Sequence, residues 1–584
     1  MKLTLNKKEL VLSGGIRYQK IPQYSPQVRS TGEQLRSDKS PIPEWAPEDL
    51  SQGLGRKYWR RDRTQYHFGS AMTLWARQIT LPLLPQEATF SGTALVQMDY
   101  TALHKGIQYG FYKEGQAIKC ATWDGSSWTI KSTVVATGVE TFVGVSSDTS
   151  LLAYYGVAGG DVYSTASTDG TTWVAVVAVT GKTPAAVAVS PTLGREYCAT
   201  TTGAGQVKLY KSDDDGATWA AYCSGSAWSL YGATGTAIFL NNAGDETPYV
   251  STSEMVFQVT TTAFVPAVSM QGISSLANGR GMTVWGSLLV IPSTNGAIFF
   301  YQADGTVTPF GLDSGDGLPA DYRGDVTALC ADRWLLFAAV HATQSGVYVF
   351  DGQGWHPMWL SLANPTINSL TTSGISKPSL LFSPSKGEHL YLQNYHSNPL
   401  EMSDTQYDTQ AWIDYPIYGG NLPETKALFY YLSAHARDLL TGNEELSFYL
   451  GLDGEDPTTF VGKITEQGTK LWLPSELSSG RTMQLRVWLT RRASSTYYTP
   501  VFHYPILGTT RAGDTLLSLV CDVDITSTAS SWGKPVDTVL AELETLRGPL
   551  ELEWRDRAVM VDMQGMSVRE SDSGLTAQLT LVQL

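Results

Sequence analysis

The segment Ser212-Asp213-Asp214-Asp215-Gly216-Ala217-Thr218-Trp219 decides the fold of this chain. In such a segment the Asp carboxylate can accept hydrogen bonds from backbone N–H groups of the turn, and the Gly can adopt a positive φ. The closing Trp can then fold back over the apolar side of the hairpin. The segment therefore predicts a tight β-hairpin in which the carboxylate holds the turn.

The same turn recurs at regular spacing. Residues 167–173 and 122–128 repeat it one residue shorter, and residues 347–355 carry a degenerate copy in which Asp-Gly and Trp follow an apolar strand. The first three copies lie about 45 residues apart, which is close to the length of one four-stranded propeller blade. The predicted structural turn residues are Asp124, Gly125, Trp128, Asp169, Gly170, Trp173, Asp214, Gly216, Trp219, Asp351, Gly352 and Trp355. The pattern resembles the Asp-box hairpin of sialidase-like and related β-propellers.

Short alternating strands with regular turn signals extend this rhythm from about residue 65 to 415. Their spacing predicts a β-propeller of about seven blades, with six or eight blades as alternatives. With 55 Gly, 17 Trp, 29 Tyr and only 16% charged residues, the composition also suits a mainly β protein.

Residues 1–64 precede this rhythm and are basic and rich in Pro. Residues 1–63 carry 13 Lys and Arg against 7 Asp and Glu, a net +6, whereas the rest of the chain carries −20. This composition predicts an extended arm, with a disordered tail as the alternative. Apolar residues favour an arm that docks on its own propeller or on a neighbouring subunit; they are Trp45, Leu50, Leu54, Tyr58 and Trp59.

Two further units follow the propeller. Residues 416–508 alternate well and predict a compact β-sandwich. Residues 509–584 predict a small α+β module: a strand, one amphipathic helix that starts at Pro535, and a three-stranded meander. This plan resembles the split-barrel modules of tailed-phage tail-tube and distal-tail proteins; an ordinary α+β domain is the alternative.

Composition excludes several functions. The five cysteines are scattered, which argues against a disulfide framework or a zinc site. Neither a secretory signal nor an apolar run of membrane-spanning length is present, so we expect a chain made in a cytoplasm and not inserted in a membrane. The acidic body argues against nucleic-acid binding.

A resemblance to sialidases would imply an arginine triad for a substrate carboxylate. Between residues 110 and 415 the only arginines are Arg195, Arg280, Arg323 and Arg333, none of them in the sequence context of those enzymes. The eight histidines are dispersed, and no nucleotide-binding or nucleophile motif occurs. The sequence therefore predicts no enzyme, no catalytic residue, no cofactor and no metal site.

The order of arm, propeller, sandwich and α+β module resembles structural proteins of tailed-phage virions. The resemblance implies a component of the tail tip, baseplate or nozzle, assembled in the host cytoplasm and located in the virion tail. Expected partners are other tail proteins and further copies of the chain in a symmetric assembly, with a host-surface glycan or receptor as a further candidate. The alternatives are a glycan- or receptor-binding adhesin and a glycoside hydrolase of propeller fold.

Overall fold

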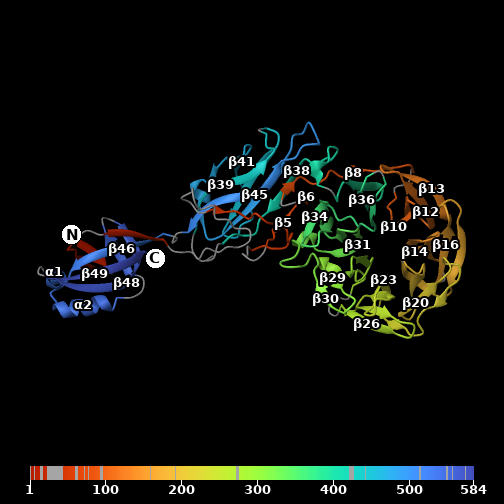
Figure 1. The fold of residues 1–584 in the computed structure, drawn as a ribbon, viewed down its shortest axis with the longest axis horizontal. Helices are drawn as coiled ribbons and strands as arrows, with labels where there is room; N and C mark the ends of the chain where they lie inside the picture. Colours follow the sequence, from red (N-terminus) through yellow and green to blue (C-terminus); the bar gives the residue numbers. More distant parts are fainter. Residues whose placement is uncertain are drawn as a thin grey trace.

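The computed structural model places three parts in a row, with both chain ends in the part opposite the propeller (Figure 1). The described residues are 2–5, 7–13, 17–22, 44–58, 64–70, 73–75, 78–92, 96–157, 160–190, 192–229, 231–270, 275–375, 377–396, 398–419, 427–440, 442–511, 515–546, 550–554, 557–571 and 574–583. We name the three parts the propeller, the sandwich and the terminal module.

The propeller consists of seven sheets in the described part of the chain, antiparallel except for the parallel pair of β9 and β13, which confirms the predicted β-propeller. Blade 1 contains β9 (Thr89–Phe90), β10 (Tyr100–His104), β11 (Ile107–Glu114), β12 (Ala117–Trp123) and β13 (Ser127–Val135). Blade 2 contains β14 (Val139–Ser147), β15 (Leu151–Val157), β16 (Asp161–Ser167) and β17 (Val174–Val179). Blade 3 contains β18 (Thr183–Val189), β19 (Glu196–Thr201), β20 (Gln206–Ser212), β21 (Ala220–Ala221) and β22 (Ala227–Trp228).

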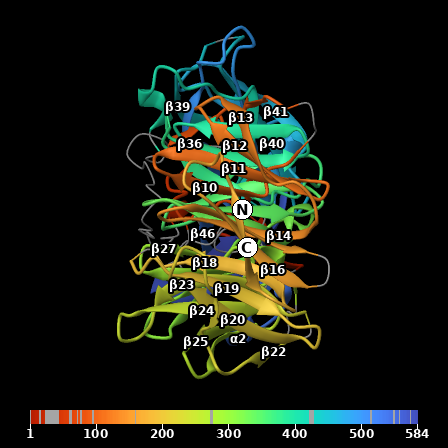
Figure 2. The ribbon, with the colours of Figure 1, turned by 90° about the vertical axis from the view of Figure 1, so that its right-hand side faces the viewer.

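The remaining four blades repeat this plan. Blade 4 contains β23 (Ala233–Leu240), β24 (Glu246–Thr252), β25 (Met255–Val259) and β26 (Phe264–Ser269). Blade 5 contains β27 (Thr283–Trp285), β28 (Leu288–Pro292), β29 (Ile298–Tyr301) and β30 (Val307–Pro309). Blade 6 contains β31 (Asp325–Ala331), β32 (Leu336–His341), β33 (Gly346–Phe350) and β34 (Trp355–Leu360). Blade 7 contains β35 (Leu370–Ser373), β36 (Ser379–Ser385), β37 (Glu388–Gln393) and β8 (Gln86–Glu87). Figure 2 shows several blades edge-on.

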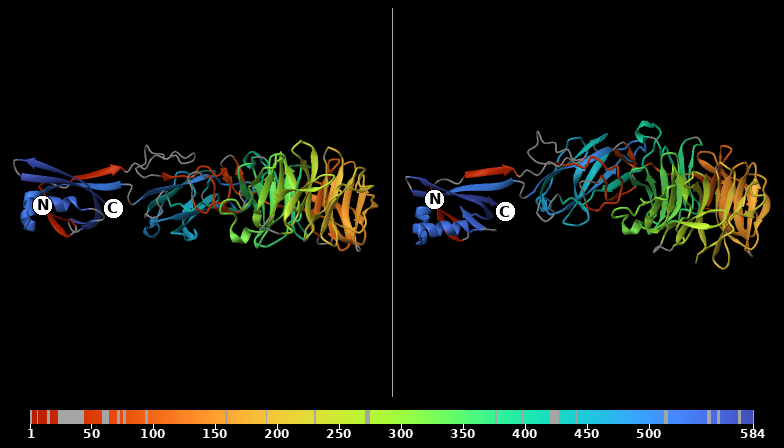
Figure 3. Two further views of the ribbon diagram at one scale, coloured as in Figure 1. Left: turned by 90° about the horizontal axis from the view of Figure 1, so that it is seen from below. Right: turned by 60° about the horizontal axis from the view of Figure 1, so that its bottom comes forward.

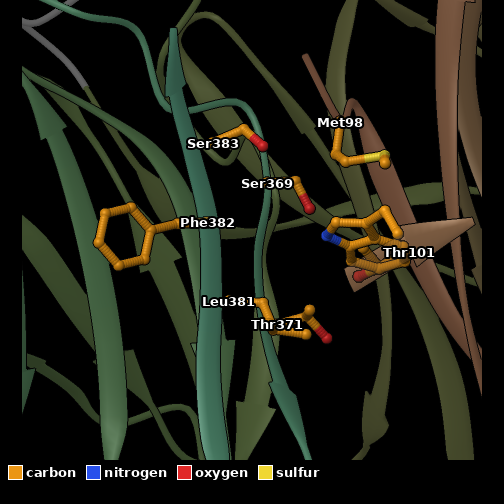
Figure 4. A pocket seen from close by; sticks show the side chains of 8 residues that line it. Met98, Thr101, Ser369, Thr371, Leu381, Phe382 and Ser383 are labelled. Carbon is orange, nitrogen blue, oxygen red and sulfur yellow. The ribbon is translucent and has the colours of Figure 1, made fainter. Parts of the chain in front are cut away.

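Residues from before the first blade close the ring. Strand β8 pairs with β37 and so supplies the outer strand of blade 7. At the seam between blades 1 and 7 a gap of about 10 Å³ remains. Met98 and Thr101 face it from one side and Ser369 and Thr371 from the other (Figure 4). A gap of this volume has room for about one water molecule.

The sandwich is built from two stretches of chain that flank the propeller in sequence. One sheet has the order β41-β40-β44-β38-β5, and the other has the order β42-β39-β45-β7-β6 with β4 and β43 at its sides. The early strands are β4 (Glu44–Trp45), β5 (Phe68–Gly69), β6 (Thr73–Trp75) and β7 (Gln78–Thr80). The later strands are β38 (Gln410–Asp414), β39 (Ala427–Arg437), β40 (Glu445–Leu452), β41 (Thr459–Ile464), β42 (Leu471–Trp472), β43 (Ser479–Gly480), β44 (Met483–Thr490) and β45 (Val501–Arg511). The predicted ranges 65–415 and 416–508 are therefore corrected, because 68–80 and 410–414 belong to the sandwich.

The sandwich and the propeller share one hydrophobic core. This core contains Phe448 and Val487 of the sandwich together with Leu336 and Tyr348 of blade 6. Tyr66 belongs to the same core, and all five side chains are buried. Four 3-10 turns lie in loops around these two parts: η1 (Thr294–Gly296), η2 (Ala320–Tyr322), η3 (Pro399–Glu401) and η4 (Ser475–Leu477). Because the buried apolar surface is continuous, we expect the two parts to behave as one rigid unit.

The terminal module has a seven-stranded sheet of order β2-β1-β47-β48-β49-β46-β3 and a separate core. Its strands are β1 (Lys2–Leu5), β2 (Lys8–Val11), β3 (Arg17–Pro22), β46 (Thr515–Asp524), β47 (Leu550–Trp554), β48 (Arg557–Ser571) and β49 (Gly574–Gln583). A bridge between Leu12 and Val523 brings the end of β2 against β46, so the sheet curls back on itself. Helices α1 (Ile525–Trp532) and α2 (Val536–Glu544) lie beside this sheet (Figure 3).

The prediction of an extended arm over residues 1–64 is wrong for residues 2–22, whereas residues 44–58 dock on the chain's own propeller and sandwich, as the apolar residues of that segment predict. Residues 2–22 contribute three strands to the terminal module, where Leu5 and Leu10 are buried with the C-terminal strands. Residues 44–58 pack on the sandwich and propeller through Trp45, Leu50 and Leu54, which are buried, whereas Tyr58 is exposed. Trp59 and the segment 23–43 lie outside the described residues. The arm prediction failed because strand pairing with residues 500 positions away leaves no local signal.

The terminal module also contains one helix more than the sequence predicts. Strand β46 ends at Asp524, and α1 begins at Ile525 because the Asp524 carboxylate accepts a hydrogen bond from Ser527 N at 2.9 Å. Gly533 then ends α1 in the left-handed conformation at φ 64°. The helix is mostly Ser, Thr and Ala, so its sequence has little apolar periodicity.

Trp532 gives a direct test of the link between the two chain ends. Its indole Nε1 donates to the carbonyl oxygen of Glu9 at 2.6 Å, and the Lys8 ammonium lies 5.1 Å from its ring. We expect Trp532→Phe to destabilise the terminal module by about 1 kcal/mol, because one hydrogen bond is lost. Hydrogen exchange of residues 2–11 would then accelerate. Trp472→Phe, at an indole that is 66% exposed, is the control; equal exchange in both variants would contradict the link.

Candidate functional site

The predicted turn residues hold hairpins in the way the motif implies. The Asp214 carboxylate accepts hydrogen bonds from Thr218 N at 2.7 Å and Thr218 Oγ1 at 2.6 Å, while Ser212 Oγ accepts from Gly216 N at 2.9 Å. Gly216 has φ 76°, which disfavours any side chain there. Trp219 Nε1 donates back to the carbonyl oxygen of Gly216 at 3.1 Å.

The other three turns have the same geometry. Asp124 Oδ1 accepts from Ser127 N at 2.7 Å, Asp169 Oδ1 from Thr171 N at 2.9 Å, and Asp351 Oδ1 from Gly354 N at 2.9 Å. The accompanying glycines Gly125, Gly170 and Gly352 all have positive φ. Trp128 and Trp355 are buried, and Trp173 and Trp219 are half-buried.

The structure does not bring these turns together into one site. Each joins the third and fourth strands of its own blade, in blades 1, 2, 3 and 6. Two of them instead contact the preceding blade. Tyr109 of blade 1 donates to the carbonyl oxygen of Asp169 at 3.2 Å, and Ser164 of blade 2 donates to that of Gly216 at 3.1 Å. These turns therefore tie neighbouring blades together.

Hydrogen bonds to the turn lower the pKa of these carboxylates. Bonds from Ser127 and Ser126 lower the pKa of Asp124 to about 2, and bonds from Thr171 lower the pKa of Asp169 to about 2. The pKa of Asp214 is lowered by its bonds from Thr218. Because the folded pKa lies below the unfolded one, the stabilisation is complete above about pH 4 and is lost as pH falls through the folded pKa.

We expect Asp214→Ala to destabilise the propeller by about 1 kcal/mol at pH 7, because the turn loses hydrogen bonds to a charged group. The difference from wild type should shrink as pH falls from about 4 toward 2, where the carboxylate becomes protonated. Thermal unfolding between pH 2 and 7 measures both effects. The control is Asp321→Ala; Asp161 is not used because its carboxylate also accepts a hydrogen bond from a turn, from Gly181 N. An equal loss of stability in Asp214→Ala and Asp321→Ala would contradict the role of Asp214 in holding its turn.

Glu196 is the one strongly perturbed carboxyl that the sequence did not single out. It opens β19, its side chain is completely buried, and Oε1 accepts a hydrogen bond from Ser146 Oγ at 3.2 Å. Oε2 has no geometrically acceptable hydrogen-bond partner among the described residues. Burial raises the pKa of Glu196 to about 7, against the lowering effect of the Tyr154 and Ser146 hydroxyls, and Asp215 and Asp148 raise it further.

The burial of Glu196 decides what it can do. A general acid must lie within hydrogen-bond reach of a substrate atom, and this carboxyl is enclosed between blades 2 and 3. Its position therefore makes it a buried group of the interface between blades 2 and 3. In the sequence, Glu196 is only a charged residue at the start of a short strand. A charged residue in that place is equally typical of a surface position, so the sequence did not indicate its burial.

Three of the four arginines considered for a carboxylate-binding triad have different partners. Arg195 in blade 3 pairs with Asp213 at 2.7 Å, Arg323 donates to the carbonyl oxygen of Asp316 at 2.8 Å, and Arg333 lies 4.8 Å from the Trp334 ring. Within the described residues no group of three or more His, Cys, Asp or Glu could hold a metal ion. No helix in the described part is long and apolar enough to cross a membrane. All five cysteines are free thiols.

The fold defines a class: a mainly β protein built on a seven-bladed propeller. Among solved structures, the chain is distantly similar to the following three proteins. Sqt1 of Saccharomyces cerevisiae matches with 13% identity over 54% of this chain and 100% of its own, at a TM-score of 0.37. BBS1N in complex with ARL6DN matches with 13% identity over 55% of this chain and 99% of its own, also at a TM-score of 0.37. YCF48 of Cyanidioschyzon merolae matches with 13% identity over 53% and 99%, at 0.38. No family model matches the sequence. No curated protein sequence matches it either.

Proposed function

We propose that the protein is a non-enzymatic structural component of a phage virion tail, at the tail tip, baseplate or nozzle. In this proposal the terminal module anchors the chain in the assembly and the propeller projects from it. The observation that carries the proposal is the nesting of the three parts. Both chain ends complete one small module with its own core, and this module lies opposite the propeller (Figures 1 and 3). The resemblance of the C-terminal sequence to split-barrel modules of tail proteins is the reason for placing this anchor in a phage tail.

A ribbon of the terminal module supports an assembly role. Residues 567–570 of β48 are exposed in succession, although alternate side chains of a strand point to opposite faces. Both faces of β48 are therefore open there, whereas the facing residue Ala577 of β49 is buried. Among the described residues, strand β47 pairs only with residues 557–561 of β48, so residues 567–570 form an exposed sheet edge that a neighbouring copy would cover.

Sizing of the purified protein tests this proposal. We expect a closed homo-oligomer in light scattering and native mass spectrometry, and we expect Val568→Asp to dissociate it. Val265→Asp in blade 4 is the matched control, because both valines are 42% exposed. A protein that stays monomeric at micromolar concentration, or an oligomer that survives Val568→Asp unchanged, would refute an assembly through this hairpin.

A glycan- or receptor-binding adhesin is the second candidate. Two large aromatic side chains near the end of blade 3 favour it: Trp228 is 65% exposed and Tyr231 is 53% exposed. Exposed aromatic faces suit stacking on sugar rings. A glycan array tests it: saturable binding that is lost in Trp228→Ala would favour the adhesin, whereas cleavage of a glycan would favour the hydrolase alternative.

A further inference from the structure

We propose that a cavity at the junction of propeller and sandwich binds a small carboxylate-bearing ring, of the size of a single sugar acid. The cavity has a volume of about 170 Å³ and lies between residues 52–56 and Gln65 on one side and the loops after β30 and before β34 on the other. This volume is similar to that of a cavity that accepts one benzene ring. Junctions between domains are frequent places for ligand sites.

The walls of the cavity are held rigidly. Leu54 N donates to the carbonyl oxygen of Trp355 at 3.0 Å, and Asp316 N donates to that of Gly55 at 2.6 Å. Gly53 lies so close to β34 that a Cβ atom there would be 2.4 Å from the Trp355 carbonyl oxygen. The cavity is therefore preformed, and a ligand would not have to order its walls.

The acceptor atoms around the cavity already have donors. Gln52 Oε1 accepts from Thr64 N at 3.3 Å, and Gln65 Oε1 accepts from Arg56 Nε at 3.1 Å. The carbonyl oxygen of Phe310 accepts from Trp355 Nε1 at 2.9 Å. The nearby Asp316 carboxylate accepts from Lys57 N at 2.7 Å.

Donors, by contrast, remain available. In the described part of the chain the two terminal nitrogens of Arg56 have no recorded partner, and the Gln52 amide nitrogen and the Ser314 hydroxyl also line the cavity as donors. A wall with many donors and few free acceptors requires a ligand rich in acceptors. A carboxylate meets this need because a guanidinium binds it through two parallel hydrogen bonds.

The rest of the lining limits the ligand to a ring with an apolar face. Trp355, Phe310 and Leu54 contribute the apolar part of the wall, and an aromatic wall packs well against such a face. A bare inorganic anion would leave this wall and most of the volume unused. This inference does not depend on the proposed assembly role, because the cavity belongs to the propeller and sandwich alone.

Calorimetric titration of the full-length protein with glucuronate and glucose tests the site, because the two sugars differ only in the carboxylate. We expect saturable binding of glucuronate that is at least about tenfold tighter than binding of glucose. Arg56→Gln should weaken glucuronate binding about tenfold or more. Lys57→Gln, which removes the same charge from the adjacent residue outside the cavity lining, should leave it unchanged.

Two controls keep the outcome decisive. An unchanged melting temperature of Arg56→Gln shows that the variant is folded, and hydrogen exchange of residues 310–315 shows whether glucuronate protects the cavity loop. The proposal is overturned by an absence of saturable glucuronate binding. It is also overturned by equal binding of glucose or by equal losses in the two variants. A negative result for glucuronate binding would not count against the proposed oligomer. A monomeric protein would likewise not count against this binding site.

Discussion

Glu196→Gln will raise the thermal stability of the propeller at pH 8 and leave it nearly unchanged at pH 4. Burial raises the pKa of this carboxyl from 4.5 to about 7. That rise corresponds to a free-energy difference of about 3 kcal/mol between the two protonation states. Since the unfolded chain loses its proton first, wild-type stability falls as pH rises from about 4.5 through 7. Gln keeps the shape of the neutral acid and carries no charge at any pH.

The groups around Glu196 make this prediction specific. The hydroxyls of Ser146 and Tyr154 face the carboxyl from blade 2, and the Asp148 and Asp215 carboxylates add negative charge nearby. Ionisation therefore places a buried charge beside like charges without a counter-ion among its recorded contacts. Glu140→Gln, at an exposed position of blade 2, is the control. The assignment fails if Glu196→Gln gives no gain at pH 8, or if Glu140→Gln gives the same pH-dependent gain.

The propeller could be predicted because its information is local. Each turn such as Asp214-Asp215-Gly216 fixes its own hairpin, and the repeat of about 45 residues sets the blade length before any long-range contact is known. The hairpins at 122–128, 167–173 and 347–355 all lie where the motif places them. The role of the turns between blades was not predictable, since Tyr109 and Ser164 contact them from an earlier blade.

The nesting of the domains could not be predicted for the opposite reason. Strand β1 pairs with β47, and β3 pairs with β46, across nearly the whole chain. The basic charge and the prolines of residues 1–64 describe only their surface chemistry. Neither property identifies the partner of a strand. The candidate cavity could not be predicted for the same reason: Arg56 and Trp355 are far apart in the sequence and come together only when the propeller packs against the sandwich.

Arg486→Met will destabilise the rigid unit of sandwich and propeller by about 3–5 kcal/mol at pH 7. Arg486 binds Asp414 through two hydrogen bonds, Nε to Oδ1 at 2.6 Å and Nη2 to Oδ2 at 2.8 Å, and its guanidinium lies 4.4 Å from the Trp412 ring. The Asp414 side chain is only 7% exposed, so removal of its partner leaves a buried charge uncompensated. Met preserves much of the packing on Trp412, which isolates the electrostatic part of the loss.

The pH dependence separates an unpaired charge from a packing defect. Burial raises the pKa of Asp414 even with Arg486 in place, and the arginine's hydrogen bonds and charge oppose that rise. Without the arginine the folded pKa will rise further, so the cost of Arg486→Met should shrink at pH 4, where Asp414 can take up a proton. Asp414→Asn in the same chain should recover part of the loss at pH 7. Arg437→Met breaks an exposed 3.8 Å pair with Asp438 and an exposed 3.3 Å hydrogen bond to Gln78 Oε1, and it should cost at most about 1 kcal/mol. A loss in Arg486→Met that is no larger than this control, or that does not change with pH, would show that the pair contributes only packing.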